Sequence, residues 1–374
     1  MPRLRVHPRD FQVEEVALYE PSGEGSETWL WIEKQERNTE DVARALAHAV
    51  GVEPAKVGFA GRKDRRAVTR QWFSVPAPAR HFEGLGLEGL ELSGVTILDR
   101  QPHTHGLRLG DLKGNRFRLR LREVNAAEAQ AAADALVTIA ERGLPNAFGQ
   151  QRFGRQRFGR QRGERHANNV ERGAEILRRI LAGQGGRRGA RRRDRFFLSA
   201  LQAAVFNRVL DRRHDSFDAL IPGDLALDPR GGLTMVTALA PDPKTVDERL
   251  RRFELSPTGP LFGSKLRPTR GEAAAIEDAA LADLDLAPMQ QLQVDLSRNR
   301  RFRLTGARRP LRIPVTVDWN HQVDEEVFDM EFELPPGSYA TVLVERLFPD
   351  NLEEVLGDHP GDDVDNIEDN DEEH

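Results

Sequence analysis

The sequence predicts a mixed α/β fold, because strand-like and helix-like patterns are interspersed along the chain. Apolar residues alternate with polar ones over residues 117–121 and 328–334, which is the two-residue period of a half-buried strand. Alanine-rich segments over residues 126–142 and 271–284 predict helices instead. The chain has 374 residues, which is enough for two domains with cores of their own.

In the N-terminal third, a helix is expected between two strands. Residues 28–32 and 71–75 are rich in aromatic and β-branched residues, which favour strands. Asn38 stands at the head of a segment with helical apolar spacing, and Gly51 stands at its end. Both are preferred capping residues, so residues 39–50 are predicted to be helical.

Further along, arginines occupy every second position of residues 116–122, which predicts a strand with a basic outer face. Residues 183–193 predict a flexible basic loop, and a helix with apolar residues over 196–205 follows it. Short strands are expected around residues 222–232. Near the C-terminus, Ser338 is placed to cap a last helix.

The composition favours a cytoplasmic protein. The chain contains no run of about 18 apolar residues that could cross a membrane. Its first residues lack the hydrophobic core of a signal peptide. The absence of cysteine excludes disulfides, thiol catalysis and thiolate metal sites.

Charge is divided unevenly along the chain. The net charge is −5, but residues 350–374 carry twelve acids and no Lys or Arg, so residues 1–349 have a net charge of +7. A block of like charge with few apolar residues is typical of a disordered tail. We expect this tail to be dispensable for activity. The alternative is that the tail weakly competes with a polyanion for the basic surface of residues 1–349.

One acid stands among bases in the segment VGFAGRKDRRAVTRQ, residues 57–71. Asp64 has five cationic neighbours in this segment, namely Arg62, Lys63, Arg65, Arg66 and Arg70. Nearby positive charge favours an ionised carboxylate, and the same charge would attract a polyanion. The pattern therefore suggests a carboxylate that acts on RNA or DNA. A solvated turn with one acid among bases is the alternative.

The same segment resembles the signature of the TruD family of tRNA pseudouridine synthases. Three further blocks resemble family motifs in the right order. Residues 8–15 (PRDFQVEE) resemble P-x-D-F-x-V-x-E, and residues 145–154 (PNAFGQQRFG) resemble P-N-Y-F-G-x-Q-R-F-G. Residues 334–341 (LPPGSYAT) resemble L-P-x-G-S-F-A-T. The resemblance thus extends over nearly the whole chain except the tail.

The resemblance implies a pseudouridine synthase catalytic domain with a mixed antiparallel sheet, interrupted by an inserted α/β domain. On this basis residues 1–171 and 314–349 form the catalytic domain, residues 172–313 form the inserted TRUD domain, and residues 350–374 form the acidic tail. The implied activity is conversion of uridine to pseudouridine, at position 13 of tRNA. The implied partner is tRNA, and the chemistry requires no metal and no cofactor. A monomer is expected.

The resemblance also implies the site residues. Asp64 matches the family's nucleophile, Phe11 and Tyr339 match aromatic residues that border the uridine pocket, and Asn146 matches its polar contact. Without the resemblance, Phe11 would be read as a docking hydrophobe and Asn146 as a turn residue. A basic residue should hold the Asp64 carboxylate; Arg5 is one candidate and Lys63 is the other.

Three other patterns each allow a functional and an ordinary explanation. Residues 84–89 spell the dinucleotide fingerprint G-x-G-x-x-G, but no clear strand leads into it and no convincing helix follows. His103 and His105 could be a metal pair, but no third ligand stands near them. The unit QRFGR at 151–155 recurs at 156–160, which suits phosphate contacts with base stacking or is a harmless duplication.

Two rival functions remain open from the sequence. The first is a non-catalytic RNA-binding protein of the same fold. The retained Asp64, Phe11 and Asn146 and the aromatic Tyr339 argue against it. The second is a base-excising glycosylase, which would also flip a base beside an aspartate but would release free uracil.

Overall fold

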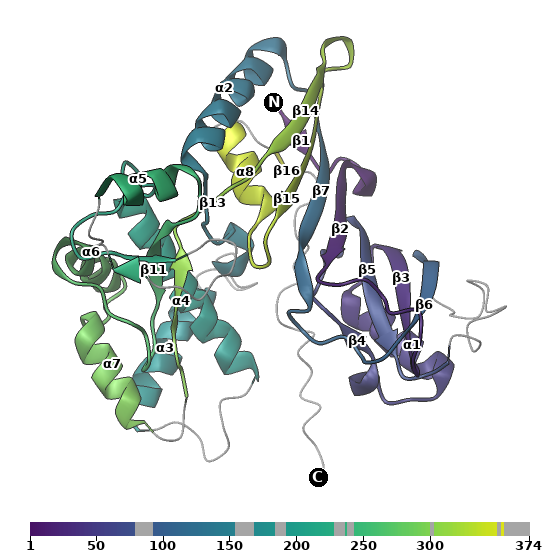
Figure 1. Cartoon of the computed structure of the whole chain (residues 1–374), viewed down its shortest axis with the longest axis horizontal. Coiled ribbons are helices and arrows are strands. Elements are labelled where there is room, and N and C mark those ends of the chain that lie inside the picture. Colours follow the sequence, from purple (N-terminus) through teal and green to yellow (C-terminus); the bar gives the residue numbers. More distant parts are fainter. Residues whose placement is uncertain are drawn as a thin grey trace, which may run out of the picture. The chain divides into compact units, whose positions relative to one another are not determined.

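The computed structural model describes residues 1–78, 93–153, 168–183, 192–227, 236–237, 243–299, 303–349 and 353–354 (Figure 1). The chain divides into two compact units. The first takes in Met1–Leu136 and Val315–Ala340, with the segment that starts at Val344. The second takes in Val137–Pro314, with Thr341–Leu343. The domain boundaries inferred from the family resemblance stay a prediction.

A mixed sheet, with ten strands among the described residues, forms the first unit. Its main path runs β14-β15-β7-β2-β5-β3-β6. The strands on this path are β14 (Val317–Gln322), β15 (Val327–Leu334), β7 (Leu112–Arg122), β2 (Phe11–Ala17), β5 (Val68–Val75), β3 (Glu27–Gln35) and β6 (Val95–His103). Along the path, β2 and β5 pair in parallel and the other pairs are antiparallel.

Three short strands lie off the main path. β1 (Arg3–Leu4) pairs with β7 and, in parallel, with β16 (Glu353–Glu354). β4 (Gly58–Phe59) pairs with β5. The pairing of β16 with β1 places one short piece of the acidic tail on the sheet, and the rest of that tail lies outside the described residues.

The long β7–β15 pair brings distant parts of the chain together. Phe117, Leu119 and Leu121 are buried, as the alternating pattern predicts. Opposite them, residues from Val327 to Leu334 pair in register with residues from Arg122 to Asn115. The C-terminal segment therefore completes the sheet that the N-terminal segment begins.

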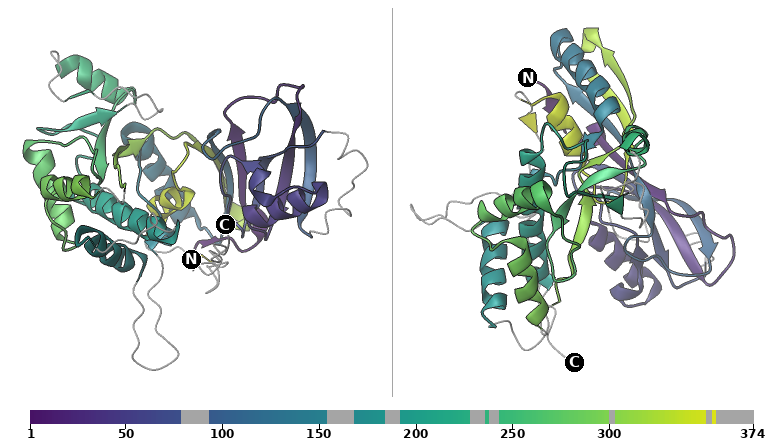
Figure 2. Two further views of the ribbon diagram at one scale, coloured as in Figure 1. Left: turned by 90° about the horizontal axis from the view of Figure 1, so that it is seen from below. Right: turned by 60° about the vertical axis from the view of Figure 1, so that its left-hand side comes forward.

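Helix α1 (Thr39–Val50) covers one face of β3 and β5 (Figure 2). On that face Leu46 packs with Ile32 and Phe73 in a buried cluster. The carboxylate of Asp41 accepts the N–H of Asn38 at 3.2 Å, and Gly51 closes the helix with φ +70°. This left-handed backbone conformation costs glycine little. The helix predicted over residues 39–50 is confirmed.

The second unit combines helices with a four-stranded sheet of order β10-β9-β11-β12 among its described residues. The strands are β9 (Leu225–Leu227), β10 (Val236–Thr237), β11 (Ser256–Leu261) and β12 (Ala307–Pro310). A separate pair joins β13 (Arg312–Ile313) to β8 (Leu144–Pro145). The helices are α3 (Asn169–Leu181), α4 (Arg192–Arg212), α5 (Pro243–Arg251), α6 (Gly271–Ala282) and α7 (Met289–Arg298).

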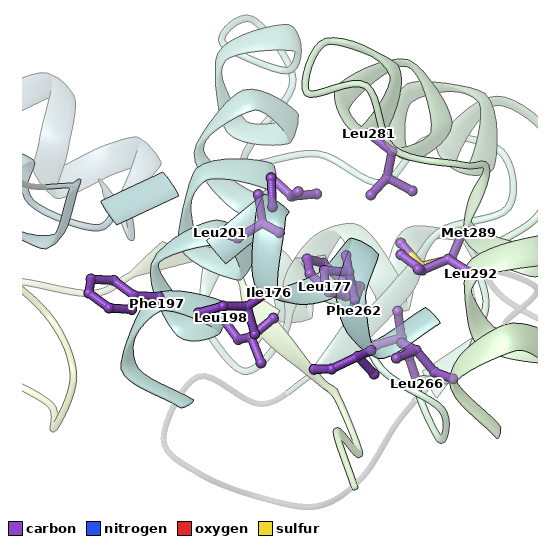
Figure 3. Close-up of a cluster of buried hydrophobic side chains, with 14 residues drawn as sticks. Ile176, Leu177, Phe197, Leu198, Leu201, Phe262, Leu266, Leu281, Met289 and Leu292 are labelled. Carbon is purple, nitrogen blue, oxygen red and sulfur yellow. The ribbon is translucent and has the colours of Figure 1, made fainter. Parts of the chain in front are cut away.

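A hydrophobic core joins the helices of this unit. Leu177 of α3, Leu201 of α4 and Leu292 of α7 meet around Phe262, and all four side chains are buried (Figure 3). A β-carbon on Gly173 would lie 2.3 Å from the carbonyl oxygen of Phe197, so glycine at this position allows α3 to approach α4 closely.

Two helices carry residues of both units, α2 (Ala126–Arg142) and α8 (Ala340–Leu347). The predicted fold class, mixed α/β, is confirmed, and so are the helix over 126–142 and the strand over 328–334. The capping role predicted for Ser338 is wrong. Helix α8 begins one residue later, so Tyr339 occupies the N-cap position.

Several sequence predictions lie outside the described residues. These are the second QRFGR copy at 156–160, most of the basic loop over 183–193, the glycine-rich segment 84–89 and most of the tail. In the described chain, no helix is long and apolar enough to cross a membrane.

Candidate active site

Asp64 lies in the loop over residues 60–67 that joins β4 to β5, named here the Asp64 loop, and its side chain is 28% exposed. Its Oδ1 accepts the backbone N–H of Arg66 at 3.0 Å. This short-range bond closes a turn of the kind that aspartate favours and fixes the carboxylate against its own loop. The second oxygen, Oδ2, is therefore the one that reaches another part of the chain.

That oxygen is bound by Arg5, which precedes β2 in the sequence. Arg5 Nη2 donates to Asp64 Oδ2 at 2.5 Å, and the Arg5 side chain is 3% exposed. Arg5 has φ +58°, a left-handed conformation that costs a non-glycine residue about 1–2 kcal/mol. Such backbone strain is concentrated at functional sites. Of the two predicted partners of Asp64, the structure selects Arg5.

Phe11 packs against the Arg5 guanidinium. The guanidinium carbon lies 3.9 Å from the centre of the Phe11 ring, a cation–π contact. Phe11 in turn meets Phe117 edge to face, with 6.3 Å between the ring centres. Phe11 is 3% exposed, so in this structure the ring supports the cation that holds Asp64.

Lys63, the other predicted partner, binds a different acid. Its Nζ lies 2.7 Å from Glu15 Oε2, and the two side chains are 3% and 1% exposed. Burial raises the pKa of Glu15, and the charge of Lys63 opposes that rise. The N–H of Trp72 also donates to Glu15 Oε1 at 3.3 Å. Lys63 thus anchors the Asp64 loop to β2 through Glu15.

Two neutral side chains anchor the loop backbone. Thr39 Oγ1 accepts the N–H of Lys63 at 3.0 Å and donates to Gln71 Oε1 at 3.1 Å. The amide of Gln71 donates to the carbonyl of Gly61 at 2.9 Å. Sequence reasoning missed Glu15, Thr39 and Gln71. Their polar character at buried positions is the signal that could have found them.

Several cations that flank Asp64 in the sequence are paired with other acids. Arg62 pairs with Glu40, and Arg70 binds Glu33 at 2.8 Å. The buried cation that holds Asp64 comes from residue 5, which lies 59 positions away in the sequence. The local sequence pattern singled out the acid but did not contain this neighbour.

The other two predicted site residues are placed as follows. Tyr339 lies in the first unit, half-buried, just before α8. Asn146 lies in the second unit and is 5% exposed. Its amide nitrogen donates to the carbonyl of Pro310 at 3.0 Å, and its amide oxygen accepts from Arg309 Nη2 at 2.5 Å. Asn146 is therefore held rigidly by β12.

The arginines of β7 do not form the basic outer face that the sequence predicted. Acids on β15 and just before β2 neutralise them, because strand pairing places those acids directly beside the arginines. The pairs are Arg116–Glu333 at 2.7 Å, Arg118–Glu331 at 2.9 Å, Arg120–Asp329 at 2.7 Å and Arg122–Asp10 at 2.8 Å. The hydrogen bond from Arg118 lowers the pKa of Glu331. This sheet face carries a ladder of ion pairs.

His103 and His105 form a hydrogen-bonded pair. The N–H of Ser22 donates to His103 Nδ1 at 2.9 Å, so the ring proton sits on Nε2, 3.3 Å from His105 Nε2. Burial lowers the pKa of His103, and His105 lowers it further. Within the described ranges, no cluster of three or more metal-ligating side chains is found. The pair packs against Tyr19 and Trp29 as part of the structure.

Asp64 lies in an arginine-rich loop and is held by an arginine from a distant segment. This arrangement is typical of an enzyme in which a carboxylate acts on a polyanion. The comparisons with known proteins agree. The family model described as tRNA pseudouridine synthase D (TruD) matches residues 2–167 and 190–347. The chain belongs to the TruD family of tRNA pseudouridine synthases.

Individual relatives support the assignment. A tRNA pseudouridine synthase D of Thermus thermophilus is 39% identical over 347 residues, covering 92% of this chain and 88% of the relative. That of an Anaeromyxobacter species is 40% identical over 355 residues, covering 92% and 91%. The crystal structure of the putative TruD protein from Methanosarcina mazei shares the fold, with a TM-score of 0.69 at 20% identity over 93% of each chain. The family resemblance seen in the sequence is confirmed.

Proposed function

We propose that this chain converts uridine to pseudouridine in tRNA, at position 13, with Asp64 as the nucleophile. The observation that carries the proposal is the Arg5–Asp64 pair at 2.5 Å, formed in the loop that bears the family signature. The motif residues alone would also be compatible with a protein that only binds RNA. A carboxylate held by a buried arginine favours catalysis.

The proposed chemistry needs one carboxylate and no redox partner. The C1′–N1 glycosidic bond breaks, the uracil turns, and a C1′–C5 bond forms while C5 loses a proton and N1 gains one. Asp64 either stabilises the cationic sugar or adds to the substrate as the C1′–N1 bond breaks. In the second case the bond to Asp64 breaks again when the C1′–C5 bond forms. Arg5 orients the carboxylate through Oδ2, and the Arg66 N–H orients it through Oδ1. No metal or cofactor takes part in this proposal.

The target base is stacked in its helix and must be flipped out to reach Asp64. We propose that Phe11 and Tyr339 border the pocket for the flipped uracil and that Asn146 supplies a polar contact. The cation–π contact with Arg5 gives Phe11 a second role, because the ring fixes the cation that orients Asp64.

The remaining assignments belong to the same proposal. tRNA is the partner, the enzyme is cytoplasmic, and it acts as a monomer. Residues 172–313 form the inserted domain and residues 1–171 with 314–349 the catalytic domain. The acidic tail, residues 350–374, is dispensable for the chemistry.

The test is to map pseudouridine after incubating the purified chain with a tRNA transcript. We expect one pseudouridine at position 13 and none when that uridine is replaced by cytidine. The same mapping in cellular tRNA with and without the protein identifies the natural targets. Release of free uracil would instead identify a glycosylase, and tight binding without product would identify an RNA-binding protein.

Phe11→Leu is expected to slow single-turnover pseudouridine formation more than it weakens tRNA binding. The change removes the aromatic ring that we propose borders the flipped uracil, and with it the cation–π contact to Arg5, which is worth about 0.5–2 kcal/mol. Leucine is preferable to alanine, because truncating a buried phenylalanine to alanine costs about 3–5 kcal/mol of stability. Phe328→Leu, a core change on β15, is the matched control, and equal rates in the two variants would refute the role.

Asn146→Ala is expected to slow turnover in the same way.

Salt dependence should separate paired arginines from those that bind RNA. Replacing Arg191, Arg192 and Arg193 with Ala is expected to flatten the plot of log affinity for tRNA against log salt, by about 0.7–0.9 for each phosphate that is no longer neutralised. Replacing Arg116, Arg118 and Arg120 should leave the slope unchanged, because acids already neutralise them. A larger change of slope in the second variant would show instead that tRNA binds the sheet face that carries the ion pairs between β7 and β15.

A further inference from the structure

Lys34 is a fully buried lysine that the proposed chemistry does not use. It lies near the end of β3 and has 0% of its surface exposed. By strand alternation it shares a face with Leu30 and Ile32, which pack against α1. Burying an ammonium group is expensive unless its charge and its donors are compensated.

Three backbone carbonyls compensate Lys34. Its Nζ donates to the carbonyl of Asp64 at 2.9 Å, to that of Lys63 at 3.3 Å and to that of Arg37 at 2.9 Å. An ammonium has three donors, and each of them finds an acceptor here. Two of the three acceptors belong to the Asp64 loop, one of them to Asp64 itself.

We propose that Lys34 is a positioning residue for Asp64. It ties the loop backbone at residues 63 and 64 to β3, and it places a buried positive charge beside the residue that bears the carboxylate. This inference rests on the proposed function and deepens it. Thr39 and Gln71 also hold the loop, but they are neutral. Lys34 therefore differs from them in adding an electrostatic component that responds to pH.

The charges around Lys34 come from two elements. Asp64 and Lys63 face it from the Asp64 loop, and Glu40 and Asp41 face it from α1. Burial is the dominant effect and lowers the pKa of Lys34 from 10.5 to about 8, against the pull of the three acids. Above that pH the amine keeps only two donors and no charge. Turnover is then expected to fall.

Stability should change in the opposite direction. The folded-state pKa of Lys34 lies below its unfolded value, so between about 8 and 10.5 the unfolded chain binds more protons than the folded one. The contribution of Lys34 to the free energy of unfolding therefore rises with pH across this window. If Lys34 had a purely structural role, its deprotonation would not lower turnover while raising the free energy of unfolding.

The experiment measures single-turnover rates between pH 6.5 and 9.5 for the wild type, Lys34→Arg, Lys34→Met and the exposed control Lys56→Met. We expect the wild-type rate to fall above about pH 8, with a slope that approaches tenfold per pH unit. Lys34→Arg should keep its rate there, because arginine stays charged. Lys34→Met should be about 10- to 100-fold slower at pH 7 and flat above it, with tRNA affinity unchanged.

Three results would overturn the inference: a wild-type rate that is flat to pH 9.5, an identical alkaline fall in Lys34→Arg, or wild-type turnover in Lys34→Met. If Lys34→Met does not fold, the comparison of the wild type with Lys34→Arg still decides whether turnover depends on the charge of residue 34. A second readout is amide hydrogen exchange at Lys63 and Arg66 at pH 7, which should be faster in Lys34→Met than in the wild type and in Lys56→Met, because the loop has lost the three hydrogen bonds of the ammonium group. If the wild type forms no pseudouridine, the proposed function fails, and the exchange data still test whether Lys34 holds the loop.

Discussion

Asp64→Asn is expected to abolish turnover, by a factor of at least about 10⁴, while tRNA affinity stays within roughly threefold of wild type. Asparagine keeps the size of the side chain and one oxygen that can still accept from Arg5, but it carries no anion. An uncharged amide can neither add to the substrate nor stabilise a cationic sugar. Binding should persist, because phosphate contacts spread over many side chains supply most of it.

The measurement is tritium release from tRNA labelled at C5 of uridine, beside a binding titration. Asp99→Asn, an exposed acid on β6, is the matched control and should retain the wild-type rate. The thermal midpoint of Asp64→Asn should be checked, since the change leaves the buried Arg5 cation without its anion. Appreciable turnover by a folded Asp64→Asn enzyme would remove Asp64 from the nucleophile role.

Local elements of the fold could be predicted because their signals are local. Asn38 and Gly51 mark the two ends of α1, and the alternation over residues 328–334 marks β15. The pairing of β15 with β7 could not be predicted, since it joins residues about two hundred positions apart. Composition and periodicity carry no information about which strand lies next to which.

The same limit explains the β7 arginines. Alternation identified their face of the strand correctly, but the charge of that face depends on the neighbouring strands. Asp329, Glu331 and Glu333 repeat at the same two-residue spacing as Arg116, Arg118 and Arg120. Complementary charge on two strand-like segments was therefore a usable signal for their pairing.

At the site, the sequence could single out the acid but not its environment. Arg5 and Lys63 were equivalent candidates until the fold placed Glu15 beside Lys63. The side chains that hold the loop come from β2, β3, β5 and α1, so only the three-dimensional structure shows that they converge. Lys34 had a local signal, since it continues the buried series of Leu30 and Ile32 along one strand face.

Arg5→Ala is expected to lower the single-turnover rate by about 10- to 150-fold and to leave tRNA affinity nearly unchanged. The change removes a charge-assisted hydrogen bond to Asp64, a class of bond worth about 1.5–3 kcal/mol. Asp64 Oδ1 would keep its bond to the Arg66 N–H, but Oδ2 would no longer be oriented by the guanidinium. Arg5→Lys should recover most of the rate, because an ammonium can also donate to Oδ2.

A glycine variant separates the guanidinium from the strained backbone. Arg5 has φ +58°, so alanine retains the conformational cost and glycine relieves it. If the loss of rate comes from the missing guanidinium, Arg5→Gly and Arg5→Ala will be equally slow, although Arg5→Gly will be the more stable of the two. Recovery of turnover in Arg5→Gly would show instead that the backbone of residue 5, and not its charge, sets the position of Asp64. Arg3→Ala, which removes an exposed pair with Glu123, should behave as wild type throughout.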